Sequence, residues 1–153
     1  MSILIIGAGD IGFYLAKKLV QEKKNVFVIE KDEKKVRRLT DEVNCQALAA
    51  SGSDPRVLYE AGVERAEMLV AVTDSDEVNL TACMLAGLQS HVPIKIARIR
   101  SESYVSPEAR AKYHLDKLGI DLIINPERGA AEEILNILTV PGAVEILTFL
   151  DGK

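Results

Sequence analysis

The fold is indicated by residues 3–12, which read Ile-Leu-Ile-Ile-Gly-Ala-Gly-Asp-Ile-Gly. The four apolar residues predict a buried strand, and the glycines have the GxGxxG spacing of a dinucleotide-binding turn. Residues 13–19 continue as a helix. In such a turn Gly7 permits the tight bend, Gly9 lets a pyrophosphate approach the backbone, and Gly12 lets the helix pack on the strand.

The start of this predicted helix is an expected phosphate site. Its free N–H groups and its partial positive charge attract an anion. The candidate binding residues are Gly7, Ala8, Gly9, Asp10 and Ile11. We expect their backbone to bind the phosphates, while the side chain of Asp10 points away.

A carboxylate follows the second predicted strand, residues 25–29, which lies about twenty residues after the glycine turn. Glu30 at the end of that strand is placed to accept hydrogen bonds from the adenosine ribose hydroxyls. A 2′-phosphate would force a second negative group beside it, so Glu30 favours NAD or another plain adenine nucleotide over NADP. Lys31 directly after it softens this preference. A solvated strand end is the alternative interpretation of Glu30.

Composition sets the class of protein. The chain has 153 residues of which 48% are hydrophobic, which suits one compact domain. The net charge of −4 gives no electrostatic reason to expect nucleic-acid binding, and no segment is apolar enough for direct membrane insertion. Cys45 and Cys83 stand far apart in apolar contexts, so we expect buried free thiols and no metal site.

Strands and helices alternate along the chain. This alternation predicts an α/β fold: a Rossmann-like, doubly wound, parallel six-stranded sheet with helices on both faces. The expected strands are residues 3–6, 25–29, 45–50, 68–72, 94–100 and 121–124. The expected later helices are residues 32–39, 55–61, 77–88, 107–118 and 126–138.

Further candidate ligand contacts follow the other strands, because ligands bind beyond the carboxyl ends of parallel strands. Gly52 lies where an adenine ring is expected, and Thr73 and Asp74 lie near the pyrophosphate or second ribose. Arg98 has the guanidinium that pairs bidentately with phosphate. Two alternatives stay open: Thr73 and Asp74 cap the next helix, or Arg98 pairs with Asp74 or Asp76.

The fifth predicted strand has an unusual face. Its strict alternation places Ile94, Ile96, Arg98 and Arg100 together. We expect this face to point inward and to bring its arginines to the ligand.

The last part of the chain has more apolar surface than the sheet needs. The apolar residues of the helix over 126–138, among them Ile134, Ile137 and Leu138, form a wider surface than one sheet face requires. We therefore divide the chain into a dinucleotide-binding domain (1–125), a crossover or dimerisation helix (126–140) and the start of a following segment (141–153). Residues 144–150 look like an opening strand, so we expect the natural chain to continue.

Catalytic groups are not evident in the sequence. A nicotinamide dehydrogenase needs a second region that presents substrate and an acid or base to the cofactor. Nearly every residue here is used in building the nucleotide-binding domain. We therefore expect a sensor that is not an enzyme. The alternative is the cofactor domain of an NAD-dependent dehydrogenase that lacks its substrate domain.

Several segments together resemble a known family. They are residues 5–12, 28–32, 51–62, 69–79, 96–100 and 141–143. Val-Thr-Asp-Ser-Asp-Glu at 72–77 and Ala-Arg-Ile-Arg at 97–100 are more specific than the glycine motif. These segments are similar to the N-terminal nucleotide-binding domain (RCK or KTN domain) of Trk system potassium uptake regulators.

The resemblance implies a function. Domains of this family bind NAD(H), and often ATP or ADP, through the positions of Gly7 to Ile11, Glu30, Thr73, Asp74 and Arg98. They assemble as homodimers and higher rings on the cytoplasmic face of a membrane-embedded potassium channel subunit. Nucleotide exchange changes the shape of the ring and so potassium permeation. The helix at 126–138 matches one that crosses to a partner subunit.

Overall fold

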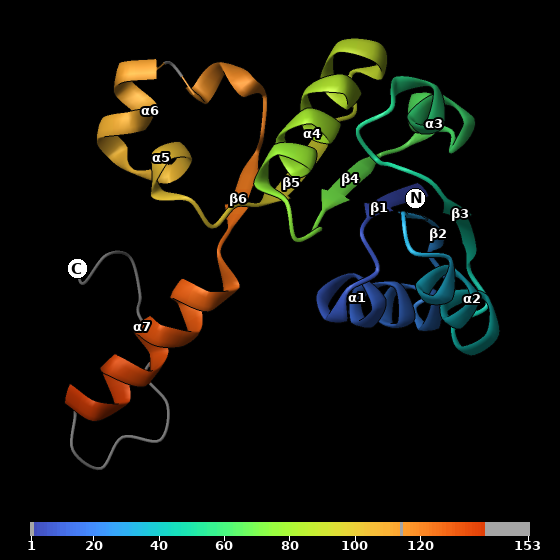
Figure 1. Ribbon diagram of the computed structural model, residues 1–153, viewed down its shortest axis with the longest axis horizontal. Coiled ribbons are helices and arrows are strands. Elements are labelled where there is room, and N and C mark those ends of the chain that lie inside the picture. The colour runs from blue at the N-terminus through green and yellow to red at the C-terminus, as the bar shows by residue number, and fades with distance from the viewer. Residues whose placement is uncertain (1, 114, 140–153) are drawn as a thin grey trace.

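The sheet is fully parallel and has six strands in the order β3-β2-β1-β4-β5-β6 (Figure 1). The computed structural model describes residues 2–113 and 115–139. The strands are β1 (Ser2–Ile6), β2 (Asn25–Glu30), β3 (Gln46–Ala49), β4 (Met68–Ala71), β5 (Ile94–Arg98) and β6 (Leu122–Ile124). The predicted fold class is confirmed. The strand order reverses at β1 and β4, whose carboxyl ends are where an open α/β sheet forms its ligand crevice.

Helices cover both faces of the sheet (Figure 1). On one face lie α1 (Asp10–Gln21) and α2 (Glu33–Glu42), and on the other lie α3 (Pro55–Glu60) and α4 (Asp76–Ser90). The remaining helices are η1 (Val63–Arg65), α5 (Glu102–Val105), α6 (Pro107–Tyr113), η2 (Leu115–Leu118) and α7 (Pro126–Thr139). Asp32 caps α2 and Asp54 caps α3, in each case by accepting a backbone N–H two residues on.

The core consists of two layers separated by the sheet. Ile3 and Ile5 of β1 pack with α1 and α2, and Leu4 and Ile6 pack with α3 and α4. All four are at most 1% exposed, as expected of a central parallel strand that is covered on both faces. Cys45 and Cys83 are buried free thiols, as predicted. Burial raises the pKa of Cys83 to about 12.

Two expectations about the second half of the sheet are wrong. The single helix predicted over 107–118 is instead the α-helix α6 and the short 3-10 helix η2, and a further short helix, α5, precedes Pro107. Pro107 disfavours a helical conformation of the residue before it, so α5 ends at Val105 and α6 begins at Pro107. The face of β5 that α4 covers carries Lys95 and Ala97. The face that carries Arg98, which was expected to point inward, is the opposite one.

Lys95 is buried although it is charged, because its ammonium group has two partners. The Nζ atom donates to the carbonyl of Val92 at 2.8 Å and lies 3.2 Å from the carboxylate of Asp121. The opposite side of β5 borders an open apolar groove beside α1. Arg98 is partly accessible and Arg100 is exposed.

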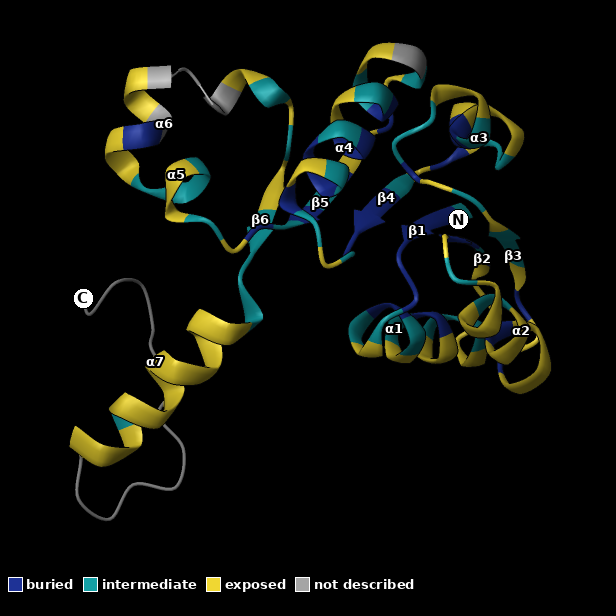
Figure 2. Cartoon of the chain, viewed as in Figure 1, coloured by how far each residue is buried: buried dark blue, intermediate teal, exposed yellow. Residues whose placement is uncertain are grey.

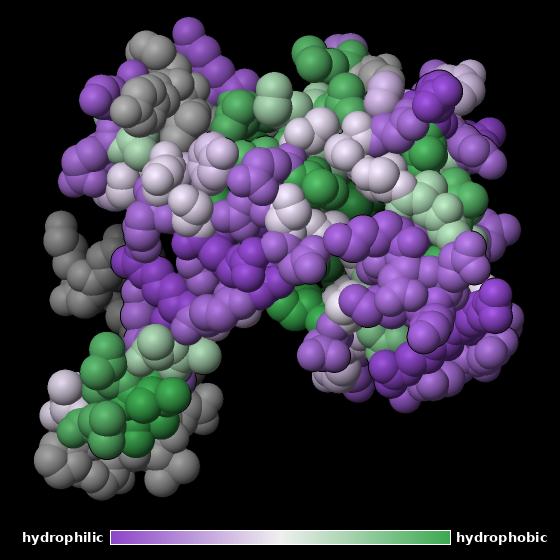
Figure 3. All heavy atoms as spheres, viewed as in Figure 1, coloured by the Kyte–Doolittle hydropathy of each residue, from purple (hydrophilic) through white to green (hydrophobic). Residues whose placement is uncertain are grey.

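The last described helix stands away from the sheet. No residue of α7 is buried, and Figure 2 draws nearly the whole helix as exposed. Its side chains Ile134, Leu135 and Leu138 are 58%, 59% and 72% exposed, and they form the apolar cluster at the lower left of Figure 3. Within residues 2–113 and 115–139 no helix is long and apolar enough to cross a membrane. The expectations for residues 140–153 lie outside the described part of the chain.

Candidate functional site

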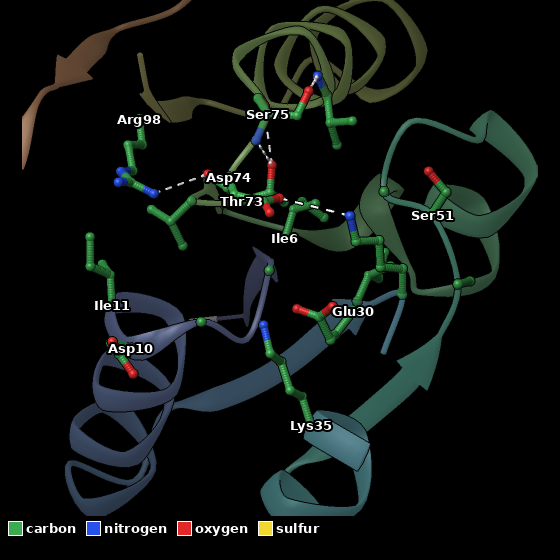
Figure 4. Close-up of a pocket in the computed structure, with 18 residues that line it drawn as sticks. Ile6, Asp10, Ile11, Glu30, Lys35, Ser51, Thr73, Asp74, Ser75 and Arg98 are labelled. Carbon is green, nitrogen blue, oxygen red and sulfur yellow. Dashed lines mark hydrogen bonds and ion pairs between the residues drawn. The ribbon is translucent and has the colours of Figure 1, made fainter. Parts of the chain in front are cut away.

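A cavity lies at the carboxyl edge of the sheet, between the glycine turn and the ends of β2, β3, β4 and β5 (Figure 4). Nine of the ten residues singled out from the sequence line it: Gly7, Gly9, Asp10, Ile11, Glu30, Gly52, Thr73, Asp74 and Arg98. The tenth, Ala8, is buried behind the turn and does not line it. Five separate stretches of sequence therefore converge on one cavity.

The glycine turn has the geometry that its sequence predicts. Gly7 has a φ of +101°, and its N–H donates to the carbonyl of Ile29 at 2.8 Å. A Cβ atom on Gly12 would lie 2.0 Å from the carbonyl oxygen of Gly7. Gly9 is the N-cap of α1 and has no side chain to cap the helix. A Cβ atom there would meet no protein atom within 4 Å, so the space before the helix N-terminus is open.

Glu30 ties the second strand to the glycine turn. Its side chain is buried, and its carboxylate accepts the N–H of Ala8 at 2.6 Å and the N–H of Asp32 at 3.0 Å. Each carboxylate oxygen has a second lone pair, so both can still accept a hydroxyl hydrogen. Glu30 thus orders the turn as well as lining the cavity, and its contact with a ribose stays a prediction.

A buried amide that was not singled out from the sequence orders the loop after β4. Asn79 of α4 is fully buried, and its Oδ1 accepts the N–H of Thr73 at 2.9 Å. Its Nδ2 donates to the carbonyls of Thr73 and Arg98, at 3.2 and 2.8 Å. Asn79 therefore fixes the ends of β4 and β5 to each other. The available signal was an amide among the apolar residues of a helix predicted to pack on the sheet.

Neither alternative suggested for the residues after β4 and β5 describes them. The N-cap of α4 is Ser75, whose hydroxyl accepts the N–H of Val78 at 3.2 Å. Asp76 lies inside the helix, and its carboxylate accepts the backbone N–H groups of Arg100 and Ser101 at 3.0 and 2.8 Å. Thr73 and Asp74 are thus left in the loop that borders the cavity.

Arg98 has partners that its sequence context did not suggest. Its Nη1 donates to the carbonyl of Thr73 at 3.3 Å (Figure 4), and its Nη2 pairs with the carboxylate of Glu127 on α7. The buried Nε atom has no hydrogen-bond partner among the described residues. Arg98 therefore lies between the cavity and α7 with part of its donor capacity unused.

Comparison with known proteins identifies the family. Residues 3–126 match the model of the TrkA-N domain. The chain belongs to this family. The Trk system potassium uptake protein TrkA of Azorhizobium caulinodans is 40% identical over all 153 residues. The chain spans only 33% of the length of that relative.

Solved structures of the same fold agree with the architecture. The TrkA-N domain of the inner membrane protein ybaL from Escherichia coli superposes with a TM-score of 0.76 at 20% identity, and the match covers 90% of this chain and 96% of that one. The GsuK channel bound to NAD gives 0.65 at 23% identity, over 80% of this chain and 21% of the channel chain. At these identities the likeness establishes the fold alone.

The TrkA-N cavity combines groups suited to a polyanionic ligand. Besides Arg98, two lysines that were not selected from the sequence line it, Lys31 and Lys35. The Nζ of Lys31 lies 3.8 Å from the carboxylate of Asp74, and both side chains are exposed. Cationic side chains and an uncapped helix N-terminus favour phosphate, and the backbone and hydroxyl groups around them can bind sugar and base.

Proposed function

We propose that this TrkA-N domain is the nucleotide-sensing domain of a cytoplasmic regulator of potassium uptake, and that it binds NAD(H), ADP or ATP. The observation that carries the proposal is the cavity in which the open glycine turn, Glu30 and Arg98 meet. Its groups bind phosphate and ribose, and the role is regulatory and not catalytic. The TrkA relative supports the potassium uptake role, and the NAD-bound GsuK channel supports NAD as a ligand.

The regulatory mechanism rests on differential binding. A ligand shifts a protein between two arrangements only by the difference between its affinities for them. NADH and ATP share an adenosine and a pyrophosphate, so the glycine turn and Glu30 treat them alike. They differ beyond the second phosphate, and we infer that this part of the ligand lies toward Arg98. We infer that this end of the cavity distinguishes them, and that a membrane-embedded channel subunit responds to the difference.

The first test is direct titration of the purified chain. We expect NADH and ATP each to bind in calorimetry with a Kd on the order of micromolar to tens of micromolar. A nucleotide at about 100 times its Kd then stabilises the fold by about 2.7 kcal/mol in thermal melts. The absorbance of bound NADH is expected to stay constant with carbonyl substrates. The absence of binding by every adenine nucleotide would reject the proposal, and NADH oxidation would favour the dehydrogenase alternative.

We infer that the domain forms a homodimer through an apolar groove. The groove lies next to α1, on the side of β4, β5 and β6 that no helix of the described residues covers. It is lined almost entirely by apolar side chains: Ile11, Tyr14, Leu15, Leu19, Met68, Val70, Val72, Ile96, Leu122 and Ile124, with Asp10 at its rim. A contiguous apolar surface of this kind indicates an interaction site.

The proposed occupant of the groove is α7 of a second copy. This helix has 14 residues and is about 21 Å long, and its apolar side chains are exposed. Each copy offers one groove and one helix, so a two-fold exchange covers both apolar surfaces at once. The crossover role of the helix, and the further assembly of dimers into rings, are part of this proposal.

The dimer is tested by adding charge to α7. Ile134 and Leu138 are one turn apart and exposed, so changing both to lysine leaves the fold of one chain intact. We expect the wild type to sediment at about twice 16.7 kDa and the double variant as a monomer. Leu88→Lys, a change at an exposed residue of α4, is the control and should stay dimeric. A monomeric wild type, or a double variant that remains dimeric, contradicts the interface.

A further inference from the structure

One charged side chain touches both the cavity and α7. Arg98 lines the cavity at the end of β5, and its side chain is 15% exposed. The carbonyl of Thr73 and the carboxylate of Glu127 accept from its two terminal nitrogens. Glu127 lies in the first turn of α7, 29 residues further along the chain. A ligand that contacts Arg98 would therefore contact a side chain that is itself paired with α7.

Glu127 is a replaceable partner. Its side chain is 54% exposed, and an ion pair with such a solvated carboxylate is a weak interaction. A phosphate offers several oxygens and more charge to the same planar guanidinium, which binds such groups bidentately. Among the described residues the buried Nε of Arg98 has no hydrogen-bond partner, so the guanidinium keeps a donor that Glu127 does not use. A nucleotide phosphate and Glu127 are therefore competing acceptors for one donor group.

Among residues 2–113 and 115–139, few contacts fix α7 to the rest of the domain. Besides the pair with Arg98, Asn125 caps the helix by accepting the N–H of Arg128 at 3.0 Å, and it donates to the carbonyl of Arg100 at 3.4 Å. The guanidinium of Arg128 lies 3.4 Å from Glu102 of α5. Since no residue of α7 is buried within the single chain, polar contacts at its first turn are what join the helix to its own domain. Loss of the Glu127 contact therefore changes the freedom of the helix.

We propose that Arg98 couples the nucleotide cavity to α7 by exchanging Glu127 for a nucleotide phosphate. In the empty domain Arg98 ties the first turn of α7 to the end of β5. In the occupied domain Arg98 pairs with the phosphate, and the first turn of α7 is released. The inference rests on the proposed nucleotide-binding function and adds the side chains that transmit it. Because coupling is reciprocal, whatever fixes α7 in the released position tightens nucleotide binding.

The matched variants are Glu127→Gln and Glu132→Gln. The first removes the competing charge from Arg98. The second removes a carboxylate of the same helix that pairs with Arg128 at 2.7 Å and does not line the cavity. In calorimetry without divalent cations, we expect Glu127→Gln to tighten ATP binding about three- to fivefold, and Glu132→Gln to leave it unchanged. In an Arg98→Ala background the change at Glu127 should have no further effect.

A spin label on α7 reads the release directly. The exposed Glu133 can be changed to cysteine and labelled, because Cys45 and Cys83 are buried thiols that react poorly. We expect ATP to increase the mobility of the label in the wild type. The nucleotide-free Glu127→Gln chain should already give the ATP-bound spectrum, and Glu132→Gln should behave as the wild type.

The outcomes separate this coupling from the proposed function. If the wild type binds ATP but Glu127→Gln changes neither affinity nor spectrum, the coupling is wrong and nucleotide binding stands. Weaker binding by Glu127→Gln also overturns the coupling, because the carboxylate would then assist the ligand. If the wild type binds no nucleotide, the proposed function fails and the coupling with it.

Discussion

Replacing Gly9 by alanine is expected to abolish nucleotide binding while the domain stays folded. Gly9 lines the cavity with φ −66°, a conformation that alanine adopts without strain. The added methyl group meets no protein atom within 4 Å, so its only conflict is with a ligand at the helix N-terminus. We expect affinity for NADH or ATP to fall at least about 100-fold, or about 2.7 kcal/mol. Calorimetry measures the affinity.

The fold serves as the internal check on this variant. Alanine is a poorer N-cap than glycine, so the melting temperature should fall by no more than about 4 °C. Gly129→Ala is the matched control, because its Cβ also meets nothing within 4 Å but lies on α7, away from the cavity. It should bind as the wild type does. Affinity of Gly9→Ala within threefold of the wild type would mean that phosphate does not bind at this turn.

Replacing Gly12 by alanine is expected to destabilise the domain itself. The added Cβ would lie 2.0 Å from the carbonyl oxygen and 2.9 Å from the carbonyl carbon of Gly7. These are backbone atoms of a residue with positive φ, and its N–H is bonded to Ile29 of β2. They cannot move without separating α1 from β1. We expect a loss of about 3 kcal/mol, or roughly 10 °C in melting temperature.

Thermal melts without nucleotide measure this loss, with Gly129→Ala again as the control. Calorimetry should also give weak or absent nucleotide binding, because the turn is displaced. Two glycines three residues apart thus predict opposite outcomes: loss of the ligand with the fold kept, and loss of the fold. A melting temperature of Gly12→Ala within 2 °C of the wild type would show that the turn relaxes.

Local patterns account for the parts of the fold that the sequence predicts correctly. The apolar runs of β1 and β4 indicate buried strands, and the glycine spacing indicates the turn between β1 and α1. Parallel strands present their carboxyl ends at one edge, so residues that follow different strands converge. This is why Glu30, Thr73 and Arg98 could be assigned to one cavity.

The wrong or missed predictions concern features that depend on contacts between elements far apart in the sequence. The strict alternation of β5 does not say which face α4 covers, and the face of Lys95 and Ala97 is the covered one. A lysine was not expected inside, since its partner Asp121 is 26 residues away. Asn79 was missed for a similar reason, because its partner Arg98 lies at the end of β5, 19 residues further along the chain.

The sequence by itself determined the parallel sheet, the glycine turn and the edge at which a nucleotide would bind. Each of these depends on residues that are close in the chain and on the spacing of the apolar residues and glycines. Only the tertiary structure decided that Arg98 pairs with Glu127, that Asn79 joins two strand ends, and that α7 does not pack into the apolar groove of its own chain. These contacts depend on the approach of elements far apart in the chain. No local pattern encodes which of several carboxylates reaches a given guanidinium.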